Sequence, residues 1–178
     1  MFKKSIIMNI SDKLAIFSLI IAILSTIITI VTIIQTRIHN RKSLKPIISV
    51  ITYDYINCLK IELVNEGVGP AIIKKIVVEK NEHEKKDNLY SWMPKLPYGI
   101  HYKNYLTRES DLAMLSGKNI EMLFIQLDPE IEIQRNYREK MRGTLRQLTI
   151  KIEYTDVYNS DFPTYSKKLD LYARTDND

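Results

Sequence analysis

Residues 14–36 have the sequence LAIFSLIIAILSTIITIVTIIQT, and this stretch decides how the whole chain is organised. It contains no charged residue and no proline. At about 1.5 Å per residue, these 23 residues form a helix of about 34 Å, which is long enough to cross a hydrocarbon core of about 30 Å. The stretch therefore predicts a single transmembrane helix that anchors the rest of the chain.

The small and hydroxylated residues of this stretch follow a regular spacing. Seven of the eight alternate three and four residues apart, which places them along one seam of the helix. Small side chains let two backbones approach closely in lipid, so the seam favours self-association of the span into a homo-oligomer. The alternative is that the hydroxyls only bond back to carbonyls of their own helix. The seam consists of Ala15, Ser18, Ala22, Ser25, Thr29, Thr32 and Thr36.

The formal charge of +5 is concentrated around the span. Residues 1–45 hold seven basic and one acidic residue, a net charge of +6, whereas the remaining 19 basic and 20 acidic residues give −1. We expect the basic residues after the span to contact lipid head groups of the bilayer. A nearly neutral domain lacks the positive field of a nucleic-acid-binding protein, so we expect no nucleic-acid partner. The head-group contacts are assigned to Arg37, Arg41, Lys42 and Lys45.

The span divides the chain into segments. Residues 1–13 form a short polar tail, residues 37–45 continue the helix as a basic juxtamembrane extension, and Pro46 ends it. A cleaved signal peptide is disfavoured, because the apolar run exceeds the usual ~7–15 residues and no A-x-A-like site follows. One more Lys or Arg follows the span than precedes it, which favours a cell-membrane protein with a cytoplasmic C-terminal domain.

Residues 46–173 have the pattern of a mainly-β domain, followed by a frayed tail at 174–178. Residues 58–65 alternate apolar and polar side chains, as expected of a half-buried strand. Similar segments predict strands at 47–53, 72–78, 120–127, 147–154 and 164–173. Short helices are expected at 107–115, with Thr107 as N-cap, and from Asp128-Pro129 to about Arg142, with Gly143 as the stop. The fold class is an antiparallel β-sandwich with one or two short helices.

Two glycines and a proline separate the second and third predicted strands, in the sequence Asn65-Glu66-Gly67-Val68-Gly69-Pro70-Ala71. An apolar strand, N-x-G-x-G-P-A and a second apolar strand resemble a group of uncharacterised bacterial membrane-anchored proteins. The resemblance implies an immunoglobulin-like β-sandwich and no catalytic residue. Asn65, Gly67, Gly69 and Pro70 are assigned to a structural turn. The segment lacks the lysine spacing of a phosphate-binding loop.

Residues 89–106 contain the only tryptophan, four tyrosines and two prolines. Neither helical nor strand periodicity is clean, and long loops of this kind are often functional. We interpret the segment as a candidate recognition loop for a protein or small ligand, with Trp92, Tyr98, Tyr102 and Tyr105 as its contact residues. The alternative is that its aromatic side chains pack over one end of the sandwich.

The second predicted helix has an arginine face, formed by Arg135, Arg138, Arg142 and Arg146. Such a face could contact anionic lipid or an acidic partner. Because glutamates offset its charge and the opposite face is not strongly apolar, a solvated charged helix or an irregular insertion is the preferred interpretation. Cys58 is the only cysteine, so no internal disulfide can form, and we expect it to pack as an ordinary strand residue.

No local catalytic or metal-binding motif is present, and no cofactor or metal is predicted. The sequence is most consistent with a single-pass membrane-anchored binding protein, not an enzyme, whose β-sandwich recognises a partner and whose span self-associates. The alternative is a membrane-perturbing effector, of a phage-defence or toxin type, whose assembled spans disturb the bilayer. A membrane-tethered enzyme is the third possibility.

Overall fold

A computed structural model describes residues 9–81, 83–107 and 112–173. Its contacts divide the chain into two units, with the division between Ser43 and Leu44. The first unit contains α1 (Ile10–Ser43), an α-helix of 34 residues with no buried side chain. It is long enough and apolar enough to cross a membrane. α1 extends beyond residues 14–36 at both ends, so the basic residues up to Lys42 are helical.

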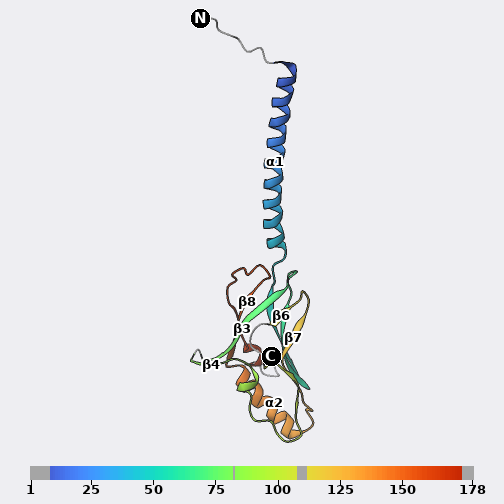
Figure 1. Cartoon of the computed structure of the whole chain (residues 1–178). Coiled ribbons are helices and arrows are strands. Elements are labelled where there is room, and N and C mark those ends of the chain that lie inside the picture. The colour runs from blue at the N-terminus through green and yellow to red at the C-terminus, as the bar shows by residue number, and fades with distance from the viewer. Residues whose placement is uncertain (1–8, 82, 108–111, 174–178) are drawn as a thin grey trace. The chain divides into compact units, whose positions relative to one another are not determined.

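The second unit consists of two antiparallel sheets (Figure 1). The first has the strand order β1-β2-β7-β5, with β1 (Ile48–Tyr55), β2 (Cys58–Asn65), β7 (Asn119–Gln126) and β5 (Tyr102–Tyr105). The second has the order β4-β3-β8-β9, with β4 (Glu84–Lys86), β3 (Ala71–Lys80), β8 (Leu148–Thr155) and β9 (Tyr165–Lys168). β6 (Leu112–Met114) pairs with the start of β3. The predicted fold class, an apolar N-terminal helix followed by a mainly-β antiparallel domain, is confirmed.

One hydrophobic core lies between the sheets. In β2 the alternation places Leu59, Ile61 and Leu63 inside, where all three are fully buried. Ile73 and Ile76 of β3 belong to the same buried cluster, as do residues of β7 and β8. The two sheets therefore form a β-sandwich around a shared core.

Asn65 fixes the turn between β2 and β3. Its side-chain oxygen accepts hydrogen bonds from the backbone N–H groups of Ile47 (3.2 Å) and Gly67 (3.1 Å). Its amide group donates to the carbonyl oxygens of Gly69 (2.8 Å) and Met114 (3.2 Å). A fully buried asparagine thus holds three chain segments together, and it does so with four hydrogen bonds.

The glycines of this turn are required by close backbone approach. A Cβ atom on Gly69 would lie 1.8 Å from the carbonyl oxygen of Leu44, and one on Gly67 would lie 2.3 Å from the backbone nitrogen of Ile47. Neither glycine has the positive φ expected for a tight turn, since positive φ values occur at Gly99 and Gly117 instead. The motif therefore exists because the turn packs against residues 44–47, where a side chain has no room.

α2 (Glu132–Leu145) lies at one end of the sandwich in Figure 1. Its predicted start was wrong: Ile131, not Asp128, is the N-cap, because Asp128 and Pro129 form a separate turn in which the carboxylate of Asp128 accepts the N–H of Glu130. Gly143 does not stop the helix. The helix continues for two residues because Leu145 is fully buried, and burial outweighs the weak helix propensity of glycine.

Other predicted elements also differ from the structure. β6 is found within 107–115, where a helix was expected, because residues 112–114 pair with the first three residues of β3. Residues 108–111 of the expected helix lie outside the described residues. The last strand ends at Lys168 and a 3₁₀ turn, η2 (Asp170–Ala173), follows it. This change of conformation buries Tyr172, whose hydroxyl donates to the carbonyl oxygens of Tyr53 and Lys60, both at 3.3 Å.

Candidate functional site

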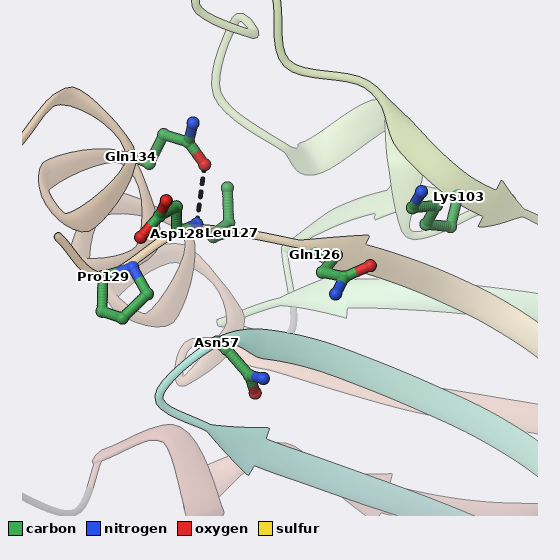
Figure 2. A pocket seen from close by; sticks show the side chains of 7 residues that line it. All are labelled: Asn57, Lys103, Gln126, Leu127, Asp128, Pro129 and Gln134. Atoms are coloured by element: carbon green, nitrogen blue, oxygen red, sulfur yellow. Dashed lines mark hydrogen bonds between the residues drawn. The ribbon is translucent and has the colours of Figure 1, made fainter. Parts of the chain in front are cut away.

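A polar hollow lies at the end of the first sheet, beside the start of α2 (Figure 2). Its volume is about 460 Å³. The segment after β7 lines this hollow, and here Leu127 N–H donates to the carbonyl of Asn57 (2.8 Å) and Asp128 N–H donates to the side-chain oxygen of Gln134 (2.7 Å). Its lining consists of Asn57, Lys103, Gln126, Leu127, Asp128, Pro129 and Gln134.

The chemistry of this hollow is limited to polar contact. Amide groups, one ammonium and one carboxylate line it, without a histidine, cysteine or hydroxyl group. Asp128 and Gln134 already bond to backbone groups that lead into α2. In the described part of the chain, no three His, Cys, Asp or Glu residues are placed to hold a metal ion.

The predicted recognition loop carries a cluster of tyrosine rings. Tyr105 of β5 stacks on Tyr90 of the 3₁₀ turn η1 (Tyr90–Trp92), with ring centroids 4.5 Å apart. The ring of Tyr102 packs edge-on against both, with centroid distances of 5.4 Å to Tyr90 and 5.9 Å to Tyr105. Tyr102 is half-buried, whereas Tyr90 and Tyr105 remain exposed. The structure thus brings together two of the four predicted contact residues and adds Tyr90.

Hydrogen bonds fix this cluster to α2. The hydroxyl groups of Tyr102 and Tyr137 lie 3.0 Å apart, and the Tyr137 hydroxyl is also 3.0 Å from the Pro94 carbonyl, to which it can donate. Burial raises the pKa of the Tyr102 phenol, and the hydrogen bond to Tyr137 adds to the shift. Tyr102 therefore remains a neutral structural contact, and it holds the exposed rings in place.

Tyr98 is more exposed than Tyr90 and Tyr105. It is fully exposed and stands in a turn closed by a hydrogen bond from Ile100 N–H to the Pro97 carbonyl, at 3.3 Å. Gly99 has φ +81°, which a glycine adopts without strain. The buried side chain of Ile100 anchors the turn to the core. The turn therefore holds one aromatic ring out in water.

Trp92 does not join the exposed rings. It is half-buried against the core, and the ammonium of Lys86 lies 4.3 Å from its ring centroid. Lys86 also donates to the Ser91 carbonyl, at 2.8 Å. This arrangement matches the packing alternative for the loop, so the exposed tyrosines of residues 89–106 are Tyr90, Tyr98 and Tyr105. We refer to these three residues as the tyrosine surface.

Two of the four arginines of the predicted face on α2, Arg138 and Arg142, are buried, contrary to the solvated helix expected from sequence. Arg138 forms an ion pair with Asp54 of β1 at 2.6 Å, and Arg142 pairs with the other carboxylate oxygen at 3.0 Å. Arg138 also donates to the Tyr55 carbonyl. Since all three charged side chains are about nine-tenths buried, Arg138 and Arg142 are not available to a lipid surface. Arg135 and the C-cap residue Arg146, by contrast, are exposed.

The outer faces of both sheets carry ion pairs of mixed sign. Lys60 pairs with Glu62 and with Glu121, and these hydrogen bonds raise the pKa of the lysine, with Glu62 the larger cause. On the second sheet, Lys151 and Lys85 hold the pKa of Glu79 below its usual value. In each pair a lysine offsets the charge of a neighbouring glutamate on the same sheet. They agree with the nearly neutral composition of this unit.

The hydroxyl groups of the seam in α1 have the hydrogen bonds expected from the alternative interpretation of the seam. The seam hydroxyls bond to carbonyls of their own helix, for example Ser25 to Ala22 (2.9 Å) and Thr29 to Ser25 (2.8 Å), and Thr26 outside the seam does the same. Ala15 and Ala22 add small side chains without hydroxyls. Burial raises the pKa of the Cys58 thiol, which makes this thiol a poor nucleophile.

A family model described as Domain of unknown function (DUF8453) matches residues 8–175 of the chain. The match includes both the apolar helix and the β-sandwich. No curated protein and no solved structure matches the chain.

Proposed function

This chain belongs to the family described as Domain of unknown function (DUF8453), a description that names no function, and we propose a function for it from its own geometry. It is a single-pass membrane-anchored binding protein, and its β-sandwich, which we take to be immunoglobulin-like, recognises a protein partner. The charge distribution around the span favours a cytoplasmic sandwich. α1 supplies the anchor, and the tyrosine surface supplies the contact.

The observation that supports this proposal most strongly is the full exposure of the Tyr98 side chain. Interfaces are enriched in tyrosine, because a rigid ring offers a large contact area and loses little conformational entropy on binding. Here the ring is fully exposed, on a turn fixed by the buried side chain of Ile100. The stacked rings of Tyr90 and Tyr105, which are fixed to α2 through Tyr102, belong to the same loop.

Site-specific photo-crosslinking tests the tyrosine surface. We expect a photoreactive phenylalanine analogue at position 98, in the full chain in living cells, to give a discrete protein adduct. The matched control is the same analogue in place of Lys74, which is also exposed but lies on β3 of the second sheet. Tyr105→Ala removes the ring that stacks on Tyr90 and tests separately whether the stacked pair contributes to the same contact. Equal adducts from both positions would contradict the proposal.

We also propose that the span self-associates along its seam. The small residues of the seam permit close backbone approach, and hydroxyls bonded to their own carbonyls add no desolvation cost at the contact. The neighbouring side chains are mostly Ile and Leu, so the smaller side chains of the seam form a shallow groove along the helix.

Cysteine crosslinking in membranes tests the seam. In a Cys58→Ser background, Ser25→Cys should form a disulfide-linked dimer on mild oxidation. Ile27→Cys is the control, because position 27 lies about 200° around the helix from position 25. Dimer formation by both variants to the same extent, or by neither, would refute pairing through the seam.

A further inference from the structure

Four exposed aliphatic side chains gather at the end of the β-sandwich where the chain enters it. Ile47 is 57% exposed, Val68 69%, Leu115 64% and Val157 56%. They come from four separate segments, namely the residues just before β1, the β2–β3 turn, the β6–β7 turn and the β8–β9 loop. We refer to these four residues as the aliphatic end.

Hydrogen bonds hold three of these segments against one another. Glu66 N–H donates to the Ile47 carbonyl at 2.8 Å, and Gly117 N–H donates to the Asn65 carbonyl at 2.9 Å. The Ser116 hydroxyl donates to the Gly67 carbonyl at 2.7 Å. Together with the four hydrogen bonds of Asn65, these contacts fix residues 47, 68 and 115 at the same end of the domain.

The fourth segment lies at this end because of strand register. Thr155 pairs with Ile72, the second residue of β3, so Val157 lies level with the turn that precedes β3. The buried carboxylate of Asp156 accepts the N–H groups of Tyr158 (2.8 Å) and Ser160 (2.9 Å), which fixes the loop. The aliphatic end is therefore a preformed surface.

Such a surface is unfavourable in water, since exposed aliphatic area costs about 25 cal/mol per Å² relative to burial. Grouped apolar side chains on a folded domain mark a contact with a protein or a membrane. Lys45 and Lys118 are exposed on the same segments, beside Glu66. In the sequence, Arg37, Arg41 and Lys42 directly precede this unit. Aliphatic side chains with basic neighbours match the chemistry of an anionic lipid surface.

We propose that the aliphatic end rests on the membrane, with its side chains among the head groups of anionic phospholipids. This inference depends on the proposed insertion of residues 14–36. Residues 37–43 add about 10 Å of helix beyond the span, and the head-group layer is about 5–8 Å thick on each side. The chain enters the sandwich at the next residue, Leu44. An upright helix would therefore carry Leu44 just past the outer edge of the head-group layer, and exposed side chains at the aliphatic end are long enough to reach back to it.

Fluorescence quenching in liposomes tests this contact. The full chain, with Cys58→Ser, carries one environment-sensitive dye at Val68→Cys, at Tyr98→Cys or at Ile28→Cys in separate samples. The liposomes contain phosphatidylglycerol and lipids spin-labelled either near the head group or deep in the acyl chain. We expect the dye at 68 to be blue-shifted and quenched several-fold more than the dye at 98 by the shallow label, and the dye at 28 to be quenched by the deep label.

The outcomes separate this inference from the proposed function. Quenching at 28 without shallow-label quenching at 68 would overturn the lipid contact alone, and a blue shift at 68 without lipid quenching would assign the surface to a second protein chain. No deep quenching at 28 would overturn the membrane anchor itself. As a second variant, Val68→Glu with Leu115→Glu should abolish shallow quenching of a dye at Val157→Cys, because the carboxylates are repelled by anionic head groups.

Discussion

Asp54→Asn is expected to lower the free energy of unfolding by about 3–5 kcal/mol, because it leaves two buried guanidinium groups without their shared carboxylate. Arg138 and Arg142 contact different oxygens of Asp54, at 2.6 and 3.0 Å. Glu139 is the neighbouring acidic partner of both arginines, but its side chain is half-exposed and water screens its charge. Because asparagine has nearly the same size as aspartate, the decrease in the free energy of unfolding measures the effect of the missing charge.

Urea unfolding of the full chain in detergent, followed through the fluorescence of Trp92, measures this effect. Urea is preferred over guanidinium because it does not screen ion pairs. Asp161→Asn is the matched control, since Asp161 is exposed and its substitution should change stability by less than about 0.5 kcal/mol. Replacing Asp54, Arg138 and Arg142 together with apolar residues should cost less than Asp54→Asn alone. A neutral result for Asp54→Asn would show that the ion pairs do not hold α2 in place.

Asn65→Ala is expected to destabilise the sandwich by a similar amount, about 3–5 kcal/mol, because four buried hydrogen bonds are lost together. Two of these hydrogen bonds are to the backbone of Ile47 and Met114, which lie 18 and 49 residues away in sequence. Alanine can neither accept from the N–H groups nor donate to the carbonyls. The same urea experiment measures the loss.

Asn136→Ala provides the control, because Asn136 is exposed on α2 and alanine favours a helix. Asn65→Asp separates the two halves of the network. It keeps the acceptor for Ile47 and Gly67 but removes the amide that donates to Gly69 and Met114. We expect it to be destabilising as well, since it buries a charge against two carbonyl oxygens. Wild-type stability of Asn65→Asp would show that the amide donor is dispensable.

Local patterns predicted much of the fold. The strand at 58–65 has the same bounds in the structure, because its alternation needs no information beyond one buried face. Strands as short as β4 and β5 were not predicted, since three or four residues carry too little periodicity. Composition alone marked residues 89–106 as an unusual aromatic loop, but it left open which rings pack, as Trp92 does, and which remain exposed, as Tyr90 does.

The sequence by itself determined the apolar helix, the β-rich class and the glycine turn. Each depends on a local property, namely the hydropathy of residues 14–36, the alternation of apolar and polar side chains in the strands, and the lack of a side chain at Gly67 and Gly69. Tertiary structure alone decided which face of α2 is buried. Arginines favour water unless a carboxylate meets them, and Asp54 lies 84 residues from Arg138 in the chain. Tertiary structure also decided which aromatic rings stay in water and which aliphatic side chains share one end, because both depend on strand register across the two sheets.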